Sequence, residues 1–277
     1  MARILVFDSG VGGLSILRAL QSCEELQQQR QQWIFCSDNA FFPYGTRKED
    51  ELRTRVCDVL KAAQDQYHPD IIVLACNTAS TIALDAARAA LRVPVVGVVP
   101  AIKPAAEISQ SHCIGLLATP ATINRAYTQK LIDDFAADCK IIRIGSSEMV
   151  WMAEQQLRSG MIDNTELHRI LAPLRDAIAH DQLDTVVLAC THFPLLSQQL
   201  HEQLPEVKYW VDSGKAIAQR VAWCLSRQQE APVAHTPLPH HLALFTRLDS
   251  QARELTRALQ YFQLQDMRQL DLPLTEL

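Results

Sequence analysis

The chain has 277 residues, 48% of them hydrophobic and 21% charged, with a formal net charge of −5 and a pI near 6. This length is enough for about two globular domains, and the mild negative charge excludes the basic surface of a typical nucleic-acid-binding protein. The chain shows neither a secretory signal nor an apolar run of membrane-spanning length, and its eight cysteines lack the close spacing of a disulfide framework. The sequence therefore predicts a cytoplasmic globular protein with no nucleic-acid or membrane partner, whose cysteines stay reduced.

Aliphatic runs and helical patterns alternate along almost the whole chain. We expect strands at residues 3–8, 33–37, 70–76, 94–99, 113–118, 140–144, 185–190, 207–211 and 242–246. Helical periodicity is clearest at residues 51–67, 122–135, 148–157, 165–179 and 216–227. Such alternation predicts an α/β fold with mainly parallel sheets flanked by helices.

The division into domains is indicated by prolines and by a recurring tripeptide. Residues 94–104 contain three prolines, and the Asp-Ser-Gly of residues 8–10 recurs at residues 212–214. We therefore expect a first α/β lobe made of residues 1–98 and 212–277, and a second α/β lobe made of residues 99–211. Residues 230–241, with three prolines and three histidines, are expected to form a surface loop.

The loop after the first strand reads DSGVGG at residues 8–13 and opens a helix at Leu14. Its glycines leave the backbone amides open to close approach by a ligand. The spacing is not that of a dinucleotide-binding loop, because Ser15 stands where the last glycine would be. The carboxylate of Asp8 beside the hydroxyl of Ser9 suits a small zwitterion, although a capping Asp-Ser turn has the same pattern.

Two further segments carry candidate binding groups. The loop NAFFPYGT at residues 39–46 is rich in aromatic side chains, which pack either on the core or around a ligand pocket. Within it, Tyr44 offers a phenolic hydroxyl and Gly45 an unobstructed amide. Thr119 ends the fifth predicted strand, in the position that Asp8 holds in the first lobe, so its hydroxyl is a candidate for ligand binding or for helix capping.

One short phrase occurs twice in the chain. Residues 70–76 read DIIVLAC and residues 184–190 read DTVVLAC, with identity at five of seven positions. In each copy a strand buried on both faces stops at a cysteine, Cys76 or Cys190, and helix-starting residues follow it. Each thiol is therefore expected at the carboxyl end of a strand and the amino end of a helix, where unpaired N–H groups favour a thiolate. The residues that follow are Asn77 and Thr78 in the first copy and Thr191 and His192 in the second.

Free cysteines are also common as small core residues. That interpretation fits the other six, which lie in amphipathic helical patterns or beside apolar strands: Cys23, Cys36, Cys57, Cys113, Cys139 and Cys224. Two cysteines in equivalent settings instead indicate a symmetrical task. Inversion of a carbon centre is such a task, because a base must remove a proton from one face while an acid delivers one to the other.

Four segments, in the same order along the chain, resemble the signature motifs of the glutamate racemase family. They are FDSGVGGLS at 7–15, PYGTR at 43–47, ACNTAS at 75–80 and ACTHFPLL at 189–196. The resemblance implies a cofactor-independent, metal-free isomerase of the aspartate/glutamate racemase superfamily that supplies D-glutamate for peptidoglycan. It also implies that two α/β lobes face each other across a cleft that holds the active site, with glutamate as the small-molecule partner. The sequence does not set the oligomeric state, for which a homodimer is one candidate.

By motif position, the resemblance places the two catalytic cysteines at Cys76 and Cys190. It implies that substrate is bound by four pairs of residues: Asp8-Ser9, Tyr44-Gly45, Asn77-Thr78 and Thr191-His192. Thr119 is added to these candidates because of its position at the end of a strand. Aspartate racemases tend to have an acidic residue where His192 stands, so this residue favours glutamate, although a lone histidine can also be structural. Glu154 resembles a carboxylate that the family keeps near the cleft, but its context, MVWMAE, departs from the usual one and it is not included.

Other classes of protein stay open from the residues alone. A thiol redox or zinc protein would use Cys76 and Cys190, which lack the close partner of a C-x-x-C site. A non-catalytic amino-acid-binding protein would not need two equivalent cysteines, and a pyridoxal enzyme would need a lysine such as Lys215. Within the superfamily, an aspartate racemase or a racemase of another amino acid is the alternative.

Overall fold

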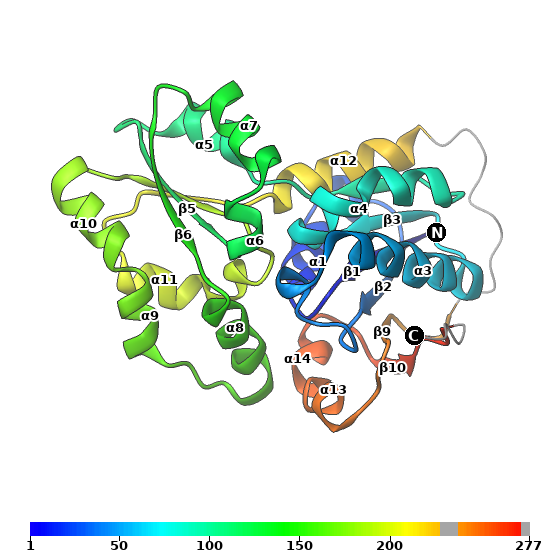
Figure 1. Ribbon diagram of the computed structural model, residues 1–277. Coiled ribbons are helices and arrows are strands. Elements are labelled where there is room, and N and C mark those ends of the chain that lie inside the picture. The colour runs from blue at the N-terminus through cyan, green and yellow to red at the C-terminus, as the bar shows by residue number, and fades with distance from the viewer. Residues whose placement is uncertain (228–237, 273–277) are drawn as a thin grey trace. The chain divides into compact units, whose positions relative to one another are not determined.

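The computed structural model describes residues 1–227 and 238–272, and the chain divides into two compact units. Unit 1 contains Met1–Val98 and Gly214–Leu277, and unit 2 contains Val99–Ser213 (Figure 1). Each unit has one sheet, and all the strand pairs of the described residues are parallel. The predicted α/β class is confirmed. Most of the predicted surface loop at 230–241 lies outside the described residues.

Unit 1 is built on a sheet with the strand order β10-β9-β2-β1-β3-β4. Its strands are β1 (Ala2–Asp8), β2 (Gln31–Ser37), β3 (Ile71–Leu74), β4 (Val95–Gly97), β9 (Leu242–Phe245) and β10 (Asp266–Gln269). Every residue of β1 and β3 is buried, as expected for central strands covered on both faces. The helices of unit 1 are α1 (Gly13–Gln21), α2 (Glu24–Gln27), η1 (Tyr44–Thr46), α3 (Glu49–Tyr67), α4 (Asn77–Ala90), α12 (Gly214–Ser226), α13 (Ser250–Glu254) and α14 (Thr256–Tyr261).

The core of unit 1 explains why α3 and α4 run side by side (Figure 1). Leu5 and Ile34 project from neighbouring strands into one cluster with Val56 and Leu60 of α3 and Ala83 of α4. Because strand side chains alternate in direction, the residues between them point to the opposite face. On that face α1 packs against α12. Helix α12 begins where the chain returns from unit 2 to unit 1, and together with α1 it covers this face of the sheet of unit 1.

Unit 2 repeats part of this plan with the strand order β6-β5-β7-β8. Its strands are β5 (Cys113–Ala118), β6 (Lys140–Gly145), β7 (Thr185–Leu188) and β8 (Tyr209–Val211). Its helices are α5 (Ile102–Ile108), α6 (Pro120–Ile123), α7 (Ala126–Phe135), α8 (Glu148–Ser159), α9 (Asn164–Ile170), α10 (Ala172–Asp181), η2 (Phe193–Leu196) and α11 (Ser197–Gln203). The order of its four strands is the same as the order β2-β1-β3-β4 in unit 1, so β3 and β7 hold equivalent positions.

Three local features differ from the sequence predictions. The helix predicted at 122–135 is two helices, α6 and α7, because Arg125 has an extended backbone at the start of the second. The helix predicted at 165–179 ends at Ile170 and restarts at Ala172, where Pro173 cannot donate the hydrogen bond of a continuous helix. Strand β10 was not predicted, since its sequence DMRQ has one apolar residue and it lies at the edge of the sheet.

The aspartate at the start of each copy of the repeated phrase accepts hydrogen bonds that link its strand to the neighbouring strand. Asp70 accepts a 2.7 Å hydrogen bond from the backbone N–H of Arg3 in β1. Asp184 accepts bonds from the segment before β5 and from the next residue along the chain: Ser109 Oγ at 2.8 Å, Gln110 N at 2.8 Å, Ser111 N at 3.1 Å, Ser111 Oγ at 3.0 Å and Thr185 Oγ1 at 2.8 Å. Burial alone would raise the pKa of Asp184, but these donors lower it from 3.8 to about 2.

No described helix is both long enough and apolar enough to cross a membrane.

The substitution Asp184→Asn tests how much the hydrogen bonds accepted by Asp184, at the start of β7, stabilise the fold. The neutral amide accepts these hydrogen bonds less strongly, so the free energy of unfolding should fall by about 1 to 3 kcal/mol at neutral pH. Because the folded pKa lies below the unfolded value, the wild-type carboxylate stabilises the fold above pH 3.8 and loses this effect as the pH falls to about 2. Urea unfolding over this range should show the pH dependence in the wild type and less of it in the variant.

Asp163→Asn is the matched control. Asp163 caps α9 by accepting a hydrogen bond from Glu166 N, and asparagine caps a helix equally well. If Asp184→Asn and the wild type had equal stability and equal pH dependence, the hydrogen bonds accepted by Asp184 would not stabilise the fold as predicted.

Candidate active site

Cys76 lies where the sequence predicts it, between a strand and a helix of unit 1. Two residues after the end of β3, it forms the N-cap of α4 with an extended backbone, and it is 7% exposed. No side chain caps α4. The first N–H groups of a helix have no partner within the helix, so those of α4 are suited to bind an anion next to the thiol.

Asp8 and Ser9 lie beside this thiol because β1 pairs with β3. Ser9 Oγ is 3.8 Å from Cys76 Sγ, and the fully buried carboxylate of Asp8 accepts a 2.9 Å hydrogen bond from Gly10 N. Gly13 permits this arrangement, since a Cβ atom there would lie 2.8 Å from the Cβ of Asp8. A carboxylate, a hydroxyl and a thiol are therefore held together at one edge of the sheet.

The phenol of Tyr44 forms a hydrogen bond within unit 1. Its hydroxyl donates a 2.7 Å hydrogen bond to Asp38 Oδ2, and burial together with this carboxylate raises the pKa of Tyr44 well above its ordinary value. Asp38 also accepts hydrogen bonds from Arg55 (2.6 and 2.9 Å) and from Thr246 Oγ1 (2.7 Å). The hydroxyl of Tyr44 therefore has a partner within unit 1. The role of Tyr44 and Gly45 in substrate binding stays a prediction.

Asn77 and Thr78 form the first turn of α4 and are both buried. The amide oxygen of Asn77 is buried with no hydrogen-bond partner among the described residues. Buried polar atoms in proteins are nearly always paired, so an acceptor of this kind indicates a donor from outside the chain, either water or a ligand. It lies one residue from the Cys76 thiol.

Cys190 is also buried at a strand end, two residues after β7, but its surroundings differ from the prediction. The chain continues into η2, a 3-10 helix, and the α-helix α11 begins only at Ser197. The reason is Pro194, which has no N–H to donate to Cys190 O in an α-helical turn. Phe193 N donates to Cys190 O instead, at 3.1 Å.

His192 forms a buried charged chain with residues of α8. Its Nε2 atom is 2.9 Å from Glu154 Oε1, and Glu154 Oε2 is 2.6 Å from the guanidinium of Arg158. The other ring nitrogen, Nδ1, is 3.9 Å from Cys190 Sγ. Burial alone would lower the pKa of His192, but its hydrogen bonds to Cys190 and Glu154 raise it well above 6.5. The raised pKa favours the protonated ring, in which both nitrogen atoms are donors.

The sequence prediction omitted Glu154, which the structure places in this chain. A signal for it was present, because Glu154 lies on the same face of α8 as the buried residues Val150 and Ala153. A carboxylate on the apolar face of a helix is rarely buried without a charged or hydrogen-bonded partner.

Thr119 is placed as a helix cap. Its hydroxyl accepts a hydrogen bond from Thr122 N at 3.2 Å and donates one to Thr122 Oγ1 at 3.0 Å, which starts α6. The capping alternative left open by the sequence thus accounts for this hydroxyl. Thr191 is buried between Cys190 and His192.

Each unit by itself therefore presents a buried thiol with charged or polar groups next to it. In unit 1 these groups are Asp8, Ser9, Asn77 and Thr78, and in unit 2 they are Thr191, His192 and Glu154. Among the described residues, neither thiol belongs to a group of three or more side chains that could hold a metal ion. A thiol next to fixed donors is suited to transfer a proton to or from a bound molecule.

Comparison with known proteins gives a consistent result. The family model for Asp/Glu/Hydantoin racemase matches residues 4–221. The chain is 52% identical over 220 residues to a glutamate racemase from Shewanella loihica, covering 79% of this chain and 80% of that protein. It is 41% identical over 248 residues to a glutamate racemase from Actinobacillus pleuropneumoniae serotype 5b, covering 90% of each. Among solved structures, the Escherichia coli glutamate racemase in complex with L-glutamate and the activator UDP-MurNAc-Ala matches with a TM-score of 0.90 and 42% identity, covering 98% of this chain and 99% of that one.

The substitution Glu154→Gln tests the electrostatics of the charged chain in unit 2. The amide keeps the shape of the side chain but removes the negative charge, so the pKa of His192 should fall toward 6.5. NMR titration of the imidazole ring measures this directly. Glu148→Gln is the control, since Glu148 starts the same helix but accepts its hydrogen bond from Ser146 Oγ at 2.8 Å. An equal pKa of His192 in both variants would show that Glu154 does not set it.

Proposed function

Because the chain belongs to the Asp/Glu/Hydantoin racemase family, we propose that it interconverts L- and D-glutamate by proton transfer between the Cα atom and two cysteines, Cys76 and Cys190. The chain is an enzyme of the racemase class. The relatives that match it over most of their length are named glutamate racemases, which supports glutamate as its substrate.

The observation that carries the proposal is the equivalence of the two thiols. Cys76 follows β3 and Cys190 follows β7, and these strands have the same position in sheets of the same strand order. Racemisation needs two groups of matched acidity on opposite faces of one carbon, since each must serve as the base in one direction and as the acid in the other. The proposed reaction therefore requires that one bound substrate be reached by a thiol from each unit.

In the proposed reaction, a thiolate removes the Cα proton and its electron pair stays on carbon. The thiol on the opposite face then donates its proton to that pair, which inverts the centre. At the end the two sulfur atoms have exchanged protonation states, so the product of one direction leaves an enzyme ready for the reverse direction. The forward and reverse reactions use the same two thiols with their roles exchanged.

The substrate's own charges match the groups beside each thiol. Its ammonium group is suited to the carboxylate of Asp8 and to the unpaired amide oxygen of Asn77, since both are buried acceptors. Its carboxylate groups are suited to the uncapped N–H groups at the start of α4 and to the imidazolium of His192. The Cα–H group is a far weaker acid than a thiol, so the developing carbanion must be stabilised. A well-placed donor typically contributes about 3 to 4 kcal/mol to such stabilisation.

His192 has a second proposed task at Cys190. Its Nδ1 atom faces the sulfur at 3.9 Å, and a positive charge there stabilises the thiolate relative to the thiol. Glu154 and Arg158 hold the ring in place from the other side. For Cys76, the N-terminus of α4 takes the corresponding role.

The remaining parts of the proposal follow from the substrate and the thiols. D-Glutamate made in this way would supply peptidoglycan synthesis, and the reaction uses neither a bound cofactor nor a metal ion. All eight cysteines are free thiols, which fits a reducing compartment such as the cytoplasm. Assembly into a homodimer stays a prediction.

The single substitutions Cys76→Ser and Cys190→Ser test the two-thiol reaction. Each should reduce racemisation by at least about 1,000-fold, because a serine hydroxyl is too weak an acid to replace a thiolate as base. The remaining thiol can still remove the Cα proton from one enantiomer. Exchange of the Cα hydrogen in deuterated water should therefore persist for one enantiomer of glutamate only, and the preferred enantiomer should reverse between the two variants. By analogy with the family, Cys76 should act on D-glutamate and Cys190 on L-glutamate.

Cys57→Ser is the control for loss of a thiol. Cys57 lies within helix α3 and does not follow a strand, so this variant should keep racemisation within about twofold of the wild type. The proposal fails if both variants prefer the same enantiomer, or if either keeps near-normal racemisation.

Substrate selectivity gives a separate test. Glutamate places its side-chain carboxylate one methylene farther from Cα than aspartate does. A misplacement of about 1 Å reduces the rate by on the order of 100-fold, so kcat/KM for glutamate should exceed that for aspartate by at least this factor. Circular dichroism of the free amino acids follows both reactions. A larger kcat/KM for aspartate would favour the alternative within the superfamily, an aspartate racemase.

A further inference from the structure

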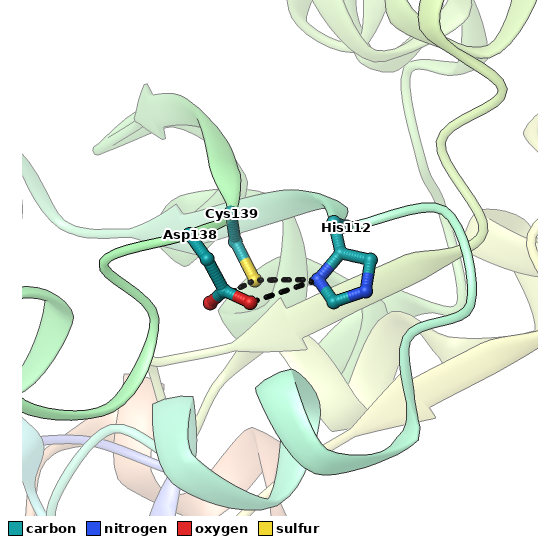
Figure 2. A group of neighbouring side chains, drawn as sticks. All are labelled: His112, Asp138 and Cys139. Carbon is teal, nitrogen blue, oxygen red and sulfur yellow. Dashed lines mark hydrogen bonds and ion pairs between the residues drawn. The ribbon is translucent and has the colours of Figure 1, made fainter.

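Three side chains of unit 2 form a cluster that the proposed racemase reaction does not use (Figure 2). His112 precedes β5, and Asp138 and Cys139 precede β6, so all three lie at the amino ends of these strands. Cys190 follows the carboxyl end of β7 in the same parallel sheet. The cluster and the thiol of unit 2 are therefore at opposite ends of the sheet.

The ligand atoms of the cluster all lie within 4.8 Å of one another. His112 Nδ1 is 3.2 Å from Asp138 Oδ2, Cys139 Sγ is 3.9 Å from the same nitrogen, and Cys139 Sγ is 3.6 Å from Asp138 Oδ1 (Figure 2). Zinc binds nitrogen and oxygen at about 2.1 Å and sulfur at about 2.3 Å, with tetrahedral angles. Two ligands of one tetrahedral site are then about 3.4 to 3.6 Å apart. The separation between His112 Nδ1 and Cys139 Sγ exceeds this value by about 0.3 Å. The carboxylate of Asp138 presents one oxygen to His112 and the other to Cys139, each within about 0.2 Å of this value.

The backbone holds the two contributing segments next to each other. Lys140 N donates a 2.7 Å hydrogen bond to His112 O, and Cys113 is in register with Lys140 in the β5–β6 pair. Cys139 N also bonds to Ala136 O at 3.0 Å. The ligands therefore stand on paired strand ends, where little ordering is needed when a metal binds.

The charges of the cluster also favour a cation. A divalent cation between Asp138 and Cys139 would attract both the carboxylate and a thiolate. The nearby ammonium group of Lys140 is paired with Asp181 at 2.6 Å.

We propose that His112, Asp138 and Cys139 form a binding site for Zn²⁺ or a similar thiophilic divalent cation. The side chains of His112 and Asp138 are 56% and 74% exposed, so water has access to the fourth position of the tetrahedron. One nitrogen, one oxygen and one sulfur ligand form a set that suits zinc better than Mg²⁺ or Ca²⁺, which prefer oxygen alone. The site is separate from the racemase chemistry, which continues without it.

Titration of the untagged, reduced protein with Co²⁺ tests this site, because Co²⁺ adopts the geometry of Zn²⁺ and shows a thiolate-to-metal charge-transfer band. The wild type should develop the band with one equivalent of Co²⁺, and Zn²⁺ should displace it. The band should be lost in Cys139→Ser, and His112→Asn should weaken Co²⁺ binding at least about 10-fold. Asparagine is chosen because His112 has a φ of 54°, which asparagine tolerates.

Two controls separate this site from the other thiols. Cys190→Ser and Cys57→Ser should keep the band with unchanged Co²⁺ affinity. Racemisation by Cys139→Ser should stay within about twofold of the wild type, with or without a chelator, which also shows that the variant is folded. The proposal is wrong if the wild type develops no band, if the band persists in Cys139→Ser, or if it disappears in Cys190→Ser.

Discussion

Parallel pairing of β1 with β3, and of β5 with β7, determines where the chemistry of this protein lies. In a parallel pair the carboxyl ends of both strands meet at one edge of the sheet, so residues far apart in sequence arrive there together. Asp8 and Ser9 reach Cys76 in this way, although 67 positions separate Ser9 from that thiol. The aspartates at the opposite end, Asp70 and Asp184, hold the same pairs in register. The repeated phrase thus has a structural residue at its start and a proposed catalytic residue at its end.

The two thiols have the same position but different electrostatic surroundings. Cys76 begins an uncapped helix, whereas Cys190 begins a short 3-10 turn and has a charged histidine beside it. The turn places fewer aligned peptide dipoles behind Cys190 than α4 places behind Cys76. The raised pKa of His192 favours a positive charge beside Cys190 in their place. A buried imidazolium is tolerated because Glu154 pairs with it, and Arg158 in turn pairs with Glu154. The N-terminus of α4 at Cys76 and the His192 ring at Cys190 are therefore two different ways to stabilise a thiolate.

Local sequence patterns were sufficient to predict what depends on local structure. The buried strands at β3 and β7, the N-cap position of Cys76 and the parallel α/β class all follow from short apolar runs that end at polar residues. The 3-10 turn after Cys190 was also encoded locally, by Pro194. The partners of buried polar groups were not predictable, since the Tyr44 hydroxyl belongs to a network that includes Thr246, and Glu154 meets His192 across 38 positions. The polar strand β10 forms because β9 is already in place to pair with it.

The insertion of unit 2 within unit 1 has a consequence for synthesis of the chain on the ribosome. When residues 1–98 have emerged, β2 still lacks its neighbour β9, and α1 lacks α12, because both partners lie beyond residue 213. Translation of all of unit 2 comes between, which takes on the order of ten seconds at bacterial rates. During that interval the nascent chain carries an unpaired strand edge and an apolar helix face, both of which attract other chains. Unit 2 has its strands in one continuous segment, so all of them have been synthesised before the last strands of unit 1. The first unit to begin is therefore the last to be completed.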